Sequence, residues 1–525
     1  MPPPSVRAAR SRAFNSLVLS APLFLLFPPA AILTIVLELL AVVFTRVVPC
    51  SSGPDAVADG GKVAPDDDVE SDQAPVTKCP VVGAFKGDLL GYFGYLRGWS
   101  VGLEGATRQA KSTVWAGNIG CPAVMCLDAT AADAIFGDAA HETTAHTTQA
   151  QYPLGPNSEP LMHFRGPKAA AARAFALAAV PAAGDDPRVA AAVDAMRDEM
   201  MQWTAMDKKT LKTESLSSLA GRCIFMFTST MILGAPLDQD LFACYMNVPH
   251  LLPMYPRWLP VWLLPLYWRA ASAKKSLVAM VRGSPNWPPL AAAATAHDLA
   301  EDVAAEYVLT MVGFHAAGAI NSFVNALHLL AAMPDRGRAL LNDAVRRRSF
   351  ALELLRFNGP SVKRVLASDT DVRTSAGARH RIRAGATLYA NTSVCQRDAT
   401  VWPDPHVFDA ERFLDGSQPL PFLGFGCPVR REGDEALFRR SHQCPSRQVI
   451  VALLEGFVTL AAGEFAYELN KPARTAIAGD AVLSRAPLRV DFSPARCVGG
   501  PIPATDHTLK TEDTPCFASF SVAED

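Results

Sequence analysis

Apolar residues recur at three- and four-residue spacing along most of the chain after about residue 90. This spacing places them on one face of a helix, and we predict helices in four long stretches, Ala169–Ala179, Arg188–Thr204, Ala291–Met333 and Val449–Ala462. Candidate strands are short, at Thr113–Trp115, Ala123–Leu127 and Thr387–Tyr389. No internal repeat of solenoid type appears. The pattern predicts one large, mainly α domain with a small β part.

The first 50 residues contain an apolar stretch, Leu17–Phe44, that is long enough to span a bilayer, for which about 20 residues are needed. Pro22, Pro28 and Pro29 interrupt it, and Glu38 lies inside it. Three arginines precede the stretch and one follows, a bias that favours a cytosolic amino terminus. Three interpretations remain open: a membrane anchor, a cleaved signal or organelle-targeting segment, and a buried core segment. An anchor would make the protein membrane-associated, in the endoplasmic reticulum or a plastid.

Residues 51–78 are rich in Asp, Gly, Pro and Ser and include the acidic run Asp66–Asp68. Such a segment is too polar to fold by itself, so we predict an acidic disordered linker. The folded domain is then expected to cover residues 79–525.

Composition narrows the possible classes of protein. With 50% hydrophobic and 19% charged residues, the chain is neither disordered throughout nor a coiled coil. A net charge of −2 gives no general attraction to nucleic acid, and we expect no such partner. Eleven cysteines, without a CxxC pair, are too few for a disulfide framework and suggest no zinc site.

Glu353 and Arg356 lie three residues apart in a predicted helix, where they share a face and can pair. A hairpin-like strand at Arg381–Asn391 follows, and then a proline-rich, irregular stretch that carries Arg412 between Glu411 and Phe413. Arg412 could complete an ion triad with the helical pair. A buried triad is unfavourable unless every donor is satisfied, so it would act as a structural clasp.

Cys444 directly precedes the last predicted helix, 18 positions after the loop glycine Gly426. The positive end of the helix dipole lowers the pKa of a thiol there and favours a thiolate, as a metal-ligating sulfur requires. The alternative is a buried structural cysteine. Cys427 is a rival ligand, but charged residues follow it and no apolar helical face does. We therefore prefer Cys444.

Taken in order, Glu-x-x-Arg, Pro-Asp-Pro with Glu-Arg-Phe, and Phe-x-x-Gly with Cys-Pro before a helix resemble the cytochrome P450 superfamily of haem-thiolate enzymes. The resemblance implies the P450 fold, a single large haem-thiolate domain, and haem b (iron protoporphyrin IX) as cofactor. It also implies Cys444 as the axial ligand of the iron, with Glu353, Arg356 and Arg412 as the structural triad.

The chain departs from the usual pattern at two points, and the first of them, an enlarged loop that ends in His442, Gln443 and Cys444, resembles the branch that metabolises hydroperoxides: allene oxide synthases, hydroperoxide lyases and epoxyalcohol synthases. The loop before Cys444 is enlarged, and Ser446 replaces the usual glycine two positions after the cysteine. The resemblance implies that His442 borders the cofactor. It also implies that Lys168 and Arg173 belong to a basic helix that neutralises a haem propionate, although such residues can equally form a solvated helix edge.

The central helix lacks the acid and threonine that a P450 monooxygenase places just after the helix glycine. Ala, Ile, Asn321 and Ser follow Gly318, and no carboxylate occurs between Glu306 and Asp335. A proton relay to haem-bound dioxygen is thus missing. His315 occupies the position of an amide that contacts the peroxide in the hydroperoxide branch, so His315 and Asn321 are candidate catalytic residues. A histidine held in a helix groove is the alternative for His315.

These patterns predict an enzyme of oxylipin biosynthesis that rearranges a fatty-acid hydroperoxide by homolytic O–O cleavage, without O2, NADPH or a reductase. Its substrate partner would be the lipid hydroperoxide, and the N-terminal segment would contact a membrane. One alternative is a membrane-bound monooxygenase that uses O2 and a reductase. Another is a haem-binding protein without catalysis, which the altered loop around Ser446 would permit.

Overall fold

The computed structural model describes residues 76–78, 112–118, 122–138, 166–181, 184–205, 216–251, 265–332, 343–359, 361–366, 368–405, 407–415, 422–425, 444–469, 475–478, 481–484, 490–494 and 508–510. The predicted apolar N-terminal stretch lies outside these residues, and so does most of the predicted linker. Within the helices of the described ranges, none combines the length and the apolar character needed to cross a bilayer.

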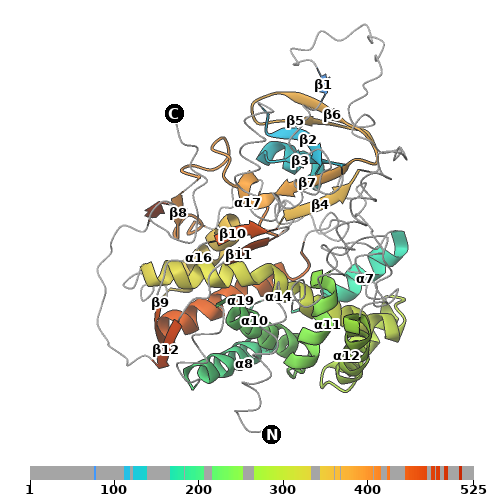
Figure 1. The fold of residues 1–525 in the computed structure, drawn as a ribbon, viewed down its shortest axis with the longest axis vertical. Helices are drawn as coiled ribbons and strands as arrows, with labels where there is room; N and C mark the ends of the chain where they lie inside the picture. Colours follow the sequence, from blue (N-terminus) through green and yellow to red (C-terminus); the bar gives the residue numbers. More distant parts are fainter. Residues whose placement is uncertain are drawn as a thin grey trace, which may run out of the picture.

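Helices form most of the molecule, as the apolar periodicity predicts (Figure 1). The long ones are α7 (Gly166–Ala179), α8 (Pro187–Thr204), α10 (Leu216–Leu233), α11 (Gln239–Leu251), α12 (Pro265–Arg282), α13 (Trp287–Ala296), α14 (Glu301–Ala332), α16 (Ala344–Phe357) and α19 (Arg447–Thr459). Two short ones are α6 (Ala129–Asp133) and α17 (Thr392–Cys395). A π-helical turn, Leu460–Glu464, continues α19.

The predicted continuous helix Ala291–Met333 is divided into α13 and α14. The division falls at Asp298, whose φ of 55° is left-handed. Aspartate tolerates this conformation better than most residues, because its short side chain can bond locally. Glu301 and Asp302 then stand in the first turn of α14, where the helix dipole favours negative charge. The apolar periodicity runs through the break, which is why it was not visible in the pattern.

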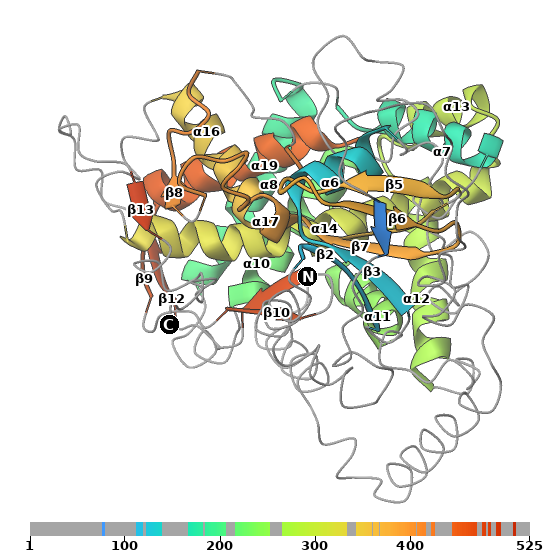
Figure 2. The same cartoon turned by 90° about the horizontal axis from the view of Figure 1, so that it is seen from above.

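The β part forms two principal sheets at one end of the helical body, seen from above in Figure 2. One has the order β2-β3-β7-β4 and the other β1-β6-β5. Their strands are β1 (Val76–Lys78), β2 (Val114–Asn118), β3 (Pro122–Cys126), β4 (Ser361–Val365), β5 (Thr370–Arg373), β6 (Arg379–Ile382) and β7 (Thr387–Asn391). Two-stranded pairs are β8 (Val407–Asp409) with β13 (Thr508–Lys510), β9 (Phe465–Leu469) with β12 (Val490–Pro494), and β10 (Thr475–Ala478) with β11 (Ala481–Ser484).

The predicted hairpin over Arg381–Asn391 was wrong. β6 pairs with β1 and β5, whereas β7 pairs with β3 and β4, so the turn between them carries the chain from one sheet to the other. Gly385, at φ 80°, allows that turn. β1 also shows that the folded part begins before residue 79, because Val76–Lys78 pairs in parallel with Arg379–Arg381.

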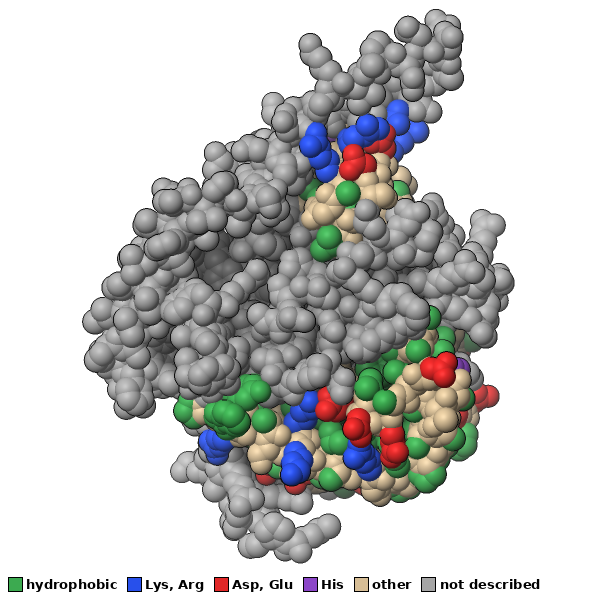
Figure 3. Space-filling model, turned by 90° about the vertical axis from the view of Figure 1, so that its right-hand side faces the viewer, with side chains coloured by type: hydrophobic (Ala, Val, Ile, Leu, Met, Phe, Trp, Pro, Cys, Tyr) green, Lys and Arg blue, Asp and Glu red, His purple; other side chains and the backbone are tan. Residues whose placement is uncertain are grey.

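α14 runs through the centre of the helical body and packs against α10, α12, α13, α16 and α19 (Figure 1). The ring of Phe323 on α14 stacks on that of Phe457 on α19, with 3.9 Å between centroids. α8 also packs tightly on α19: a Cβ added at Gly456 would lie 2.7 Å from Val193 Cγ2. On the face shown in Figure 3, basic and acidic side chains of the described residues lie next to one another, in keeping with the small net charge.

Candidate functional site

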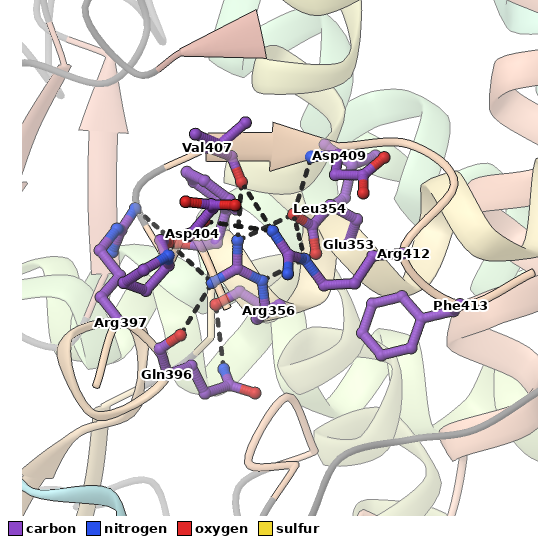
Figure 4. A network of polar contacts seen from close by, with 12 residues as sticks. Glu353, Leu354, Arg356, Gln396, Arg397, Asp404, Val407, Asp409, Arg412 and Phe413 are labelled. Atoms are coloured by element: carbon purple, nitrogen blue, oxygen red, sulfur yellow. Dashed lines mark hydrogen bonds and ion pairs between the residues drawn. The ribbon is translucent and has the colours of Figure 1, made fainter. Parts of the chain in front are cut away.

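The structure brings Glu353, Arg356 and Arg412 together in a buried ion network (Figure 4). Arg356 is bidentate on Glu353: Nε donates to Oε2 at 2.7 Å and Nη2 to Oε1 at 2.8 Å. Arg412 Nε donates to Glu353 Oε1 at 3.2 Å. Glu353 and Arg356 are wholly buried because they stand on the inner face of α16, near its end.

Backbone groups satisfy the rest of this network. Arg356 Nη1 donates to the carbonyls of Gln396 at 2.8 Å and Pro405 at 2.9 Å, and the N–H of Asp409 donates to Glu353 Oε1 at 3.0 Å. Arg412 Nη1 donates to the carbonyl of Pro403 at 2.6 Å. A buried ion pair is tolerated when its donors and acceptors are satisfied in this way. The network therefore fastens α16 to the irregular segment 401–415, which is the clasp that the motif spacing predicts.

Arg397 is a buried cation beside this network that sequence reasoning did not single out. Burial, together with the neighbouring charge of Arg356, lowers the pKa of Arg397 to about 9, although Glu353 opposes the shift. Its guanidinium stacks 4.6 Å from the ring centroid of Phe357. Arg397 differs from a surface arginine only through residues that contact it after folding. Its neighbours in the sequence therefore could not have predicted its burial.

Cys444 lies half-buried in the turn that leads into α19. Its backbone N–H donates to the carbonyl of Phe425 at 3.1 Å, which brings the segment 422–425 against the start of the helix. That segment is anchored in turn, since Leu423 N donates to Gln396 Oε1 at 2.9 Å. Phe422 packs edge-on against Phe413, with centroids 5.7 Å apart. The turn that carries Cys444 is thus tied to the same framework as the ion network.

Arg173 and Cys444 share an electrostatic environment around Tyr307 of α14. Burial raises the pKa of the Tyr307 phenol, Arg173 opposes the rise, and Cys444 adds to it. Arg173 itself is buried on α7, although it is charged. The charges of the predicted ligand and of one predicted cation thus both act on Tyr307 of the central helix. Tyr307 was not predicted, because a single aromatic residue in a long helix usually indicates core packing.

For the other predicted site residues, the structure describes the backbone only or nothing. Lys168 lies on α7, and His315 and Asn321 lie on α14, but their side chains are outside the described part of the structure. His442 and the rival Cys427 lie outside the described residues altogether.

The described groups fit a haem. A haem needs a sulfur donor to iron, a cation for its carboxylates and apolar surface. Cys444, at the start of an apolar helix, would supply the first, and the buried Arg173 would supply the second. Ser446 adds a buried hydroxyl whose Oγ has no hydrogen-bond partner among the described residues.

Comparisons with known proteins agree with this geometry. The sequence model of the family "Cytochrome P450" matches residues 350–431. The mitochondrial hydroperoxide bicyclase of Plasmodiophora brassicae is 43% identical over 70 residues, which is 13% of each chain. A probable cytochrome P450 6t1 of Drosophila melanogaster is 37% identical over 60 residues, 11% of each. The matched segments thus span a small part of these curated relatives.

Solved structures are similar over most of the chain. Cytochrome P450EX alpha with myristic acid superposes with a TM-score of 0.58 at 17% identity, covering 77% of this chain and 97% of that one. A cyanobacterial cytochrome P450 with bound retinoic acid has a TM-score of 0.59 at 17% identity, covering 75% and 94%. The chain thus has the cytochrome P450 fold, and its residues 350–431 match the sequence model of that family.

Proposed function

We propose that this enzyme rearranges a fatty-acid hydroperoxide by homolytic O–O cleavage, without O2, NADPH or a reductase. Haem b would be its cofactor, bound through Cys444. The reaction would be of the allene oxide synthase, hydroperoxide lyase or epoxyalcohol synthase type.

The observation that carries this proposal is the lack of an acid along α14 beyond its first two turns. The acids of α14 are Glu301, Asp302 and Glu306. Glu306 is engaged by Lys274 of α12, with 2.7 Å between Nζ and Oε2. It precedes Gly318 by 12 residues, which is about 18 Å along a helix. A carboxylate at that distance is too far away to protonate an oxygen species beside Gly318.

Two comparisons support the substrate class. One curated relative that matches part of this chain is named a hydroperoxide bicyclase. A structural neighbour is described with myristic acid, and another, P450BioI, with a hexadecenoic acid carried on acyl carrier protein. A long-chain fatty acyl group is therefore a suitable occupant for this fold.

The residues have separate tasks in the proposed reaction. A thiolate-bound haem iron supplies the chemistry that breaks the peroxide bond. Cys444 would bind that iron, and Arg173 and Lys168 would neutralise the haem carboxylates, with His442 close by. His315 or Asn321 of α14 would donate a hydrogen bond to the peroxide and orient it. The ion network of Glu353, Arg356 and Arg412 holds the scaffold and takes no part in the chemistry.

The test is turnover of linoleate- and linolenate-derived hydroperoxides by the haem-loaded full chain, under argon and without reductant. We expect consumption of peroxide and rearranged products that mass spectrometry assigns to one product class. Anaerobic inactivity together with NADPH-dependent oxygen uptake would establish the monooxygenase alternative. Haem binding with neither reaction would indicate a carrier.

A pair of histidine variants tests the assignment within α14. His315→Leu removes the proposed donor, and loss of one preorganised hydrogen bond typically lowers kcat by roughly 10²-fold. His315→Asn supplies an amide instead and should keep most of the activity. His297→Gln, at the end of α13, is the matched control and should leave kcat unchanged. Equal rates in all four proteins would remove His315 from the mechanism.

A further inference from the structure

The sheet β1-β6-β5 carries arginines on its outer face. Four of them lie on β5, on β6 or directly after β6, and none of the four is buried: Arg373, Arg379, Arg381 and Arg383. The residues that alternate with them, Val372, His380 and Ile382, are buried. In Figure 3, basic side chains flank a smaller acidic group near the top of the molecule, where Figure 1 places β5 and β6. We call these four arginines the arginine face.

The acids on the same strands balance only part of this charge. Asp371 Oδ1 accepts a hydrogen bond from Arg381 Nε at 2.8 Å, and Asp371 Oδ2 lies 3.6 Å from Arg379 Nη2. Asp369 bonds to the backbone, since its Oδ1 accepts from the N–H of Ala384 at 2.8 Å. Among the described residues, two arginines thus share one carboxylate.

Arg373 and Arg383 form no ion pair with any residue that the structure describes. In the register of the sheet, Arg373 stands directly opposite Arg379. On the other side of β6, Lys78 of β1 stands opposite Arg381. Like charges at directly opposite positions destabilise a sheet. An anionic partner over this face would relieve the repulsion.

The chain itself contains an anionic segment next to this sheet. Residues 66–72 contain five carboxylates and no basic side chain, and they shortly precede β1, whose Val76 pairs with Arg379. Asp72 stands four residues before Val76, and four residues of extended chain span about 13 Å. Arg373 is two strands away from β1, which is about 10 Å at the usual spacing of strands. The segment is therefore long enough to reach across the face.

We propose that the acidic segment 66–72 binds the arginine face. Its carboxylates would form ion pairs with the guanidinium groups, and Arg373 and Arg383 would gain the countercharge that the described residues do not give them. Exposed pairs of this kind are individually weak and are screened by salt, so several must act together. Binding would hold the chain before β1 against the sheet. The proposal does not depend on the reaction at the haem.

The experiment measures how fast a glutamate-specific protease cuts the full chain after Glu70, with mass spectrometry to identify the cut. A segment bound to the sheet is cut more slowly than a free one. The arginine variant combines Arg373→Gln with Arg383→Gln, and it should fold because neither side chain is buried. At low ionic strength we expect it to be cut about fivefold faster than wild type, through the loss of two exposed pairs. Salt at about 0.5 M should raise the wild-type rate to that of the variant.

The matched control is Arg269→Gln with Lys275→Gln, which removes two exposed charges from α12 and should leave the rate of cleavage unchanged. A second background carries Asp66→Asn, Asp67→Asn and Asp68→Asn. In that background the two arginine changes should accelerate cleavage less than they do in the wild type, because most of their partners are already neutral.

Equal rates at low salt in the wild type and the arginine variant would overturn the proposal. An arginine variant that is cut at the wild-type rate but no longer binds vesicles containing phosphatidylserine would overturn it as well, and would assign the arginine face to an anionic membrane surface.

Discussion

At the scale of single residues, Glu353 decides whether the charges of the buried Arg356 and the partly buried Arg412 are tolerated. Glu353→Gln would leave Arg356 and Arg412 without their countercharge, and removal of one partner from a buried network costs about 3–5 kcal/mol. Urea unfolding measures this loss. The control is Asp371→Asn, which breaks an exposed pair with Arg381 and should cost less than about 1 kcal/mol. Similar losses in both variants would show that the network is not a clasp.

Glu455, on α19, gives a prediction about pH. Burial raises the pKa of its carboxyl group above the usual value, although Arg348 and Arg347 oppose the shift. The folded state therefore holds the proton more tightly than the unfolded state, and ionisation of Glu455 reduces stability as pH rises through this range. We expect Glu455→Gln to be more stable than wild type at neutral pH. The difference should disappear below about pH 4, where the carboxyl is protonated in both states.

Thermal unfolding of both proteins at several pH values, from about 4 to about 8, checks the Glu455 prediction. A stability gain that is constant across that range would contradict it, because an uncharged contact would then be responsible.

At the scale of elements, the packing of α8 on α19 depends on the missing side chain of Gly456. In Gly456→Ala the new Cβ would meet Val193 Cγ2 at 2.7 Å. Overpacking of this kind typically costs about 1–3 kcal/mol, which exceeds the gain in helix propensity from alanine. The double variant with Val193→Ala should recover part of that loss. Urea unfolding of the two single variants and the double variant gives the coupling, and additive effects would contradict the contact.

At this scale, only the features that depend on residues close together in the sequence could be predicted. Apolar spacing predicted the helix positions. The ion network was predicted because Glu353 and Arg356 lie three residues apart and Arg412 follows them in a recognisable motif. The separation of β6 from β7 was not predictable, since both read as strands joined by a short turn and only pairing with distant strands divides them. Arg397 and Tyr307 acquire their special environments from residues far away in the sequence.

At the scale of the whole molecule, the predicted haem contacts join α7, α14 and α19 across the helical body. A ligand that binds only the folded state raises stability by mass action. We expect removal of haem to lower the unfolding temperature of the full chain, and re-addition to restore it. Cys444→Ala should show a smaller increase on addition of haem. Identical unfolding with and without haem would contradict a site built between these helices.

The close approach at Gly456 also couples the position of α8 to that of α19. Gly184, in the segment just before α8, lies close to Ala452 of α19, so that segment approaches α19 as well. Cys444 lies in the turn at the start of α19. A substitution that displaces α8 would consequently also shift α19 and the turn that carries the sulfur.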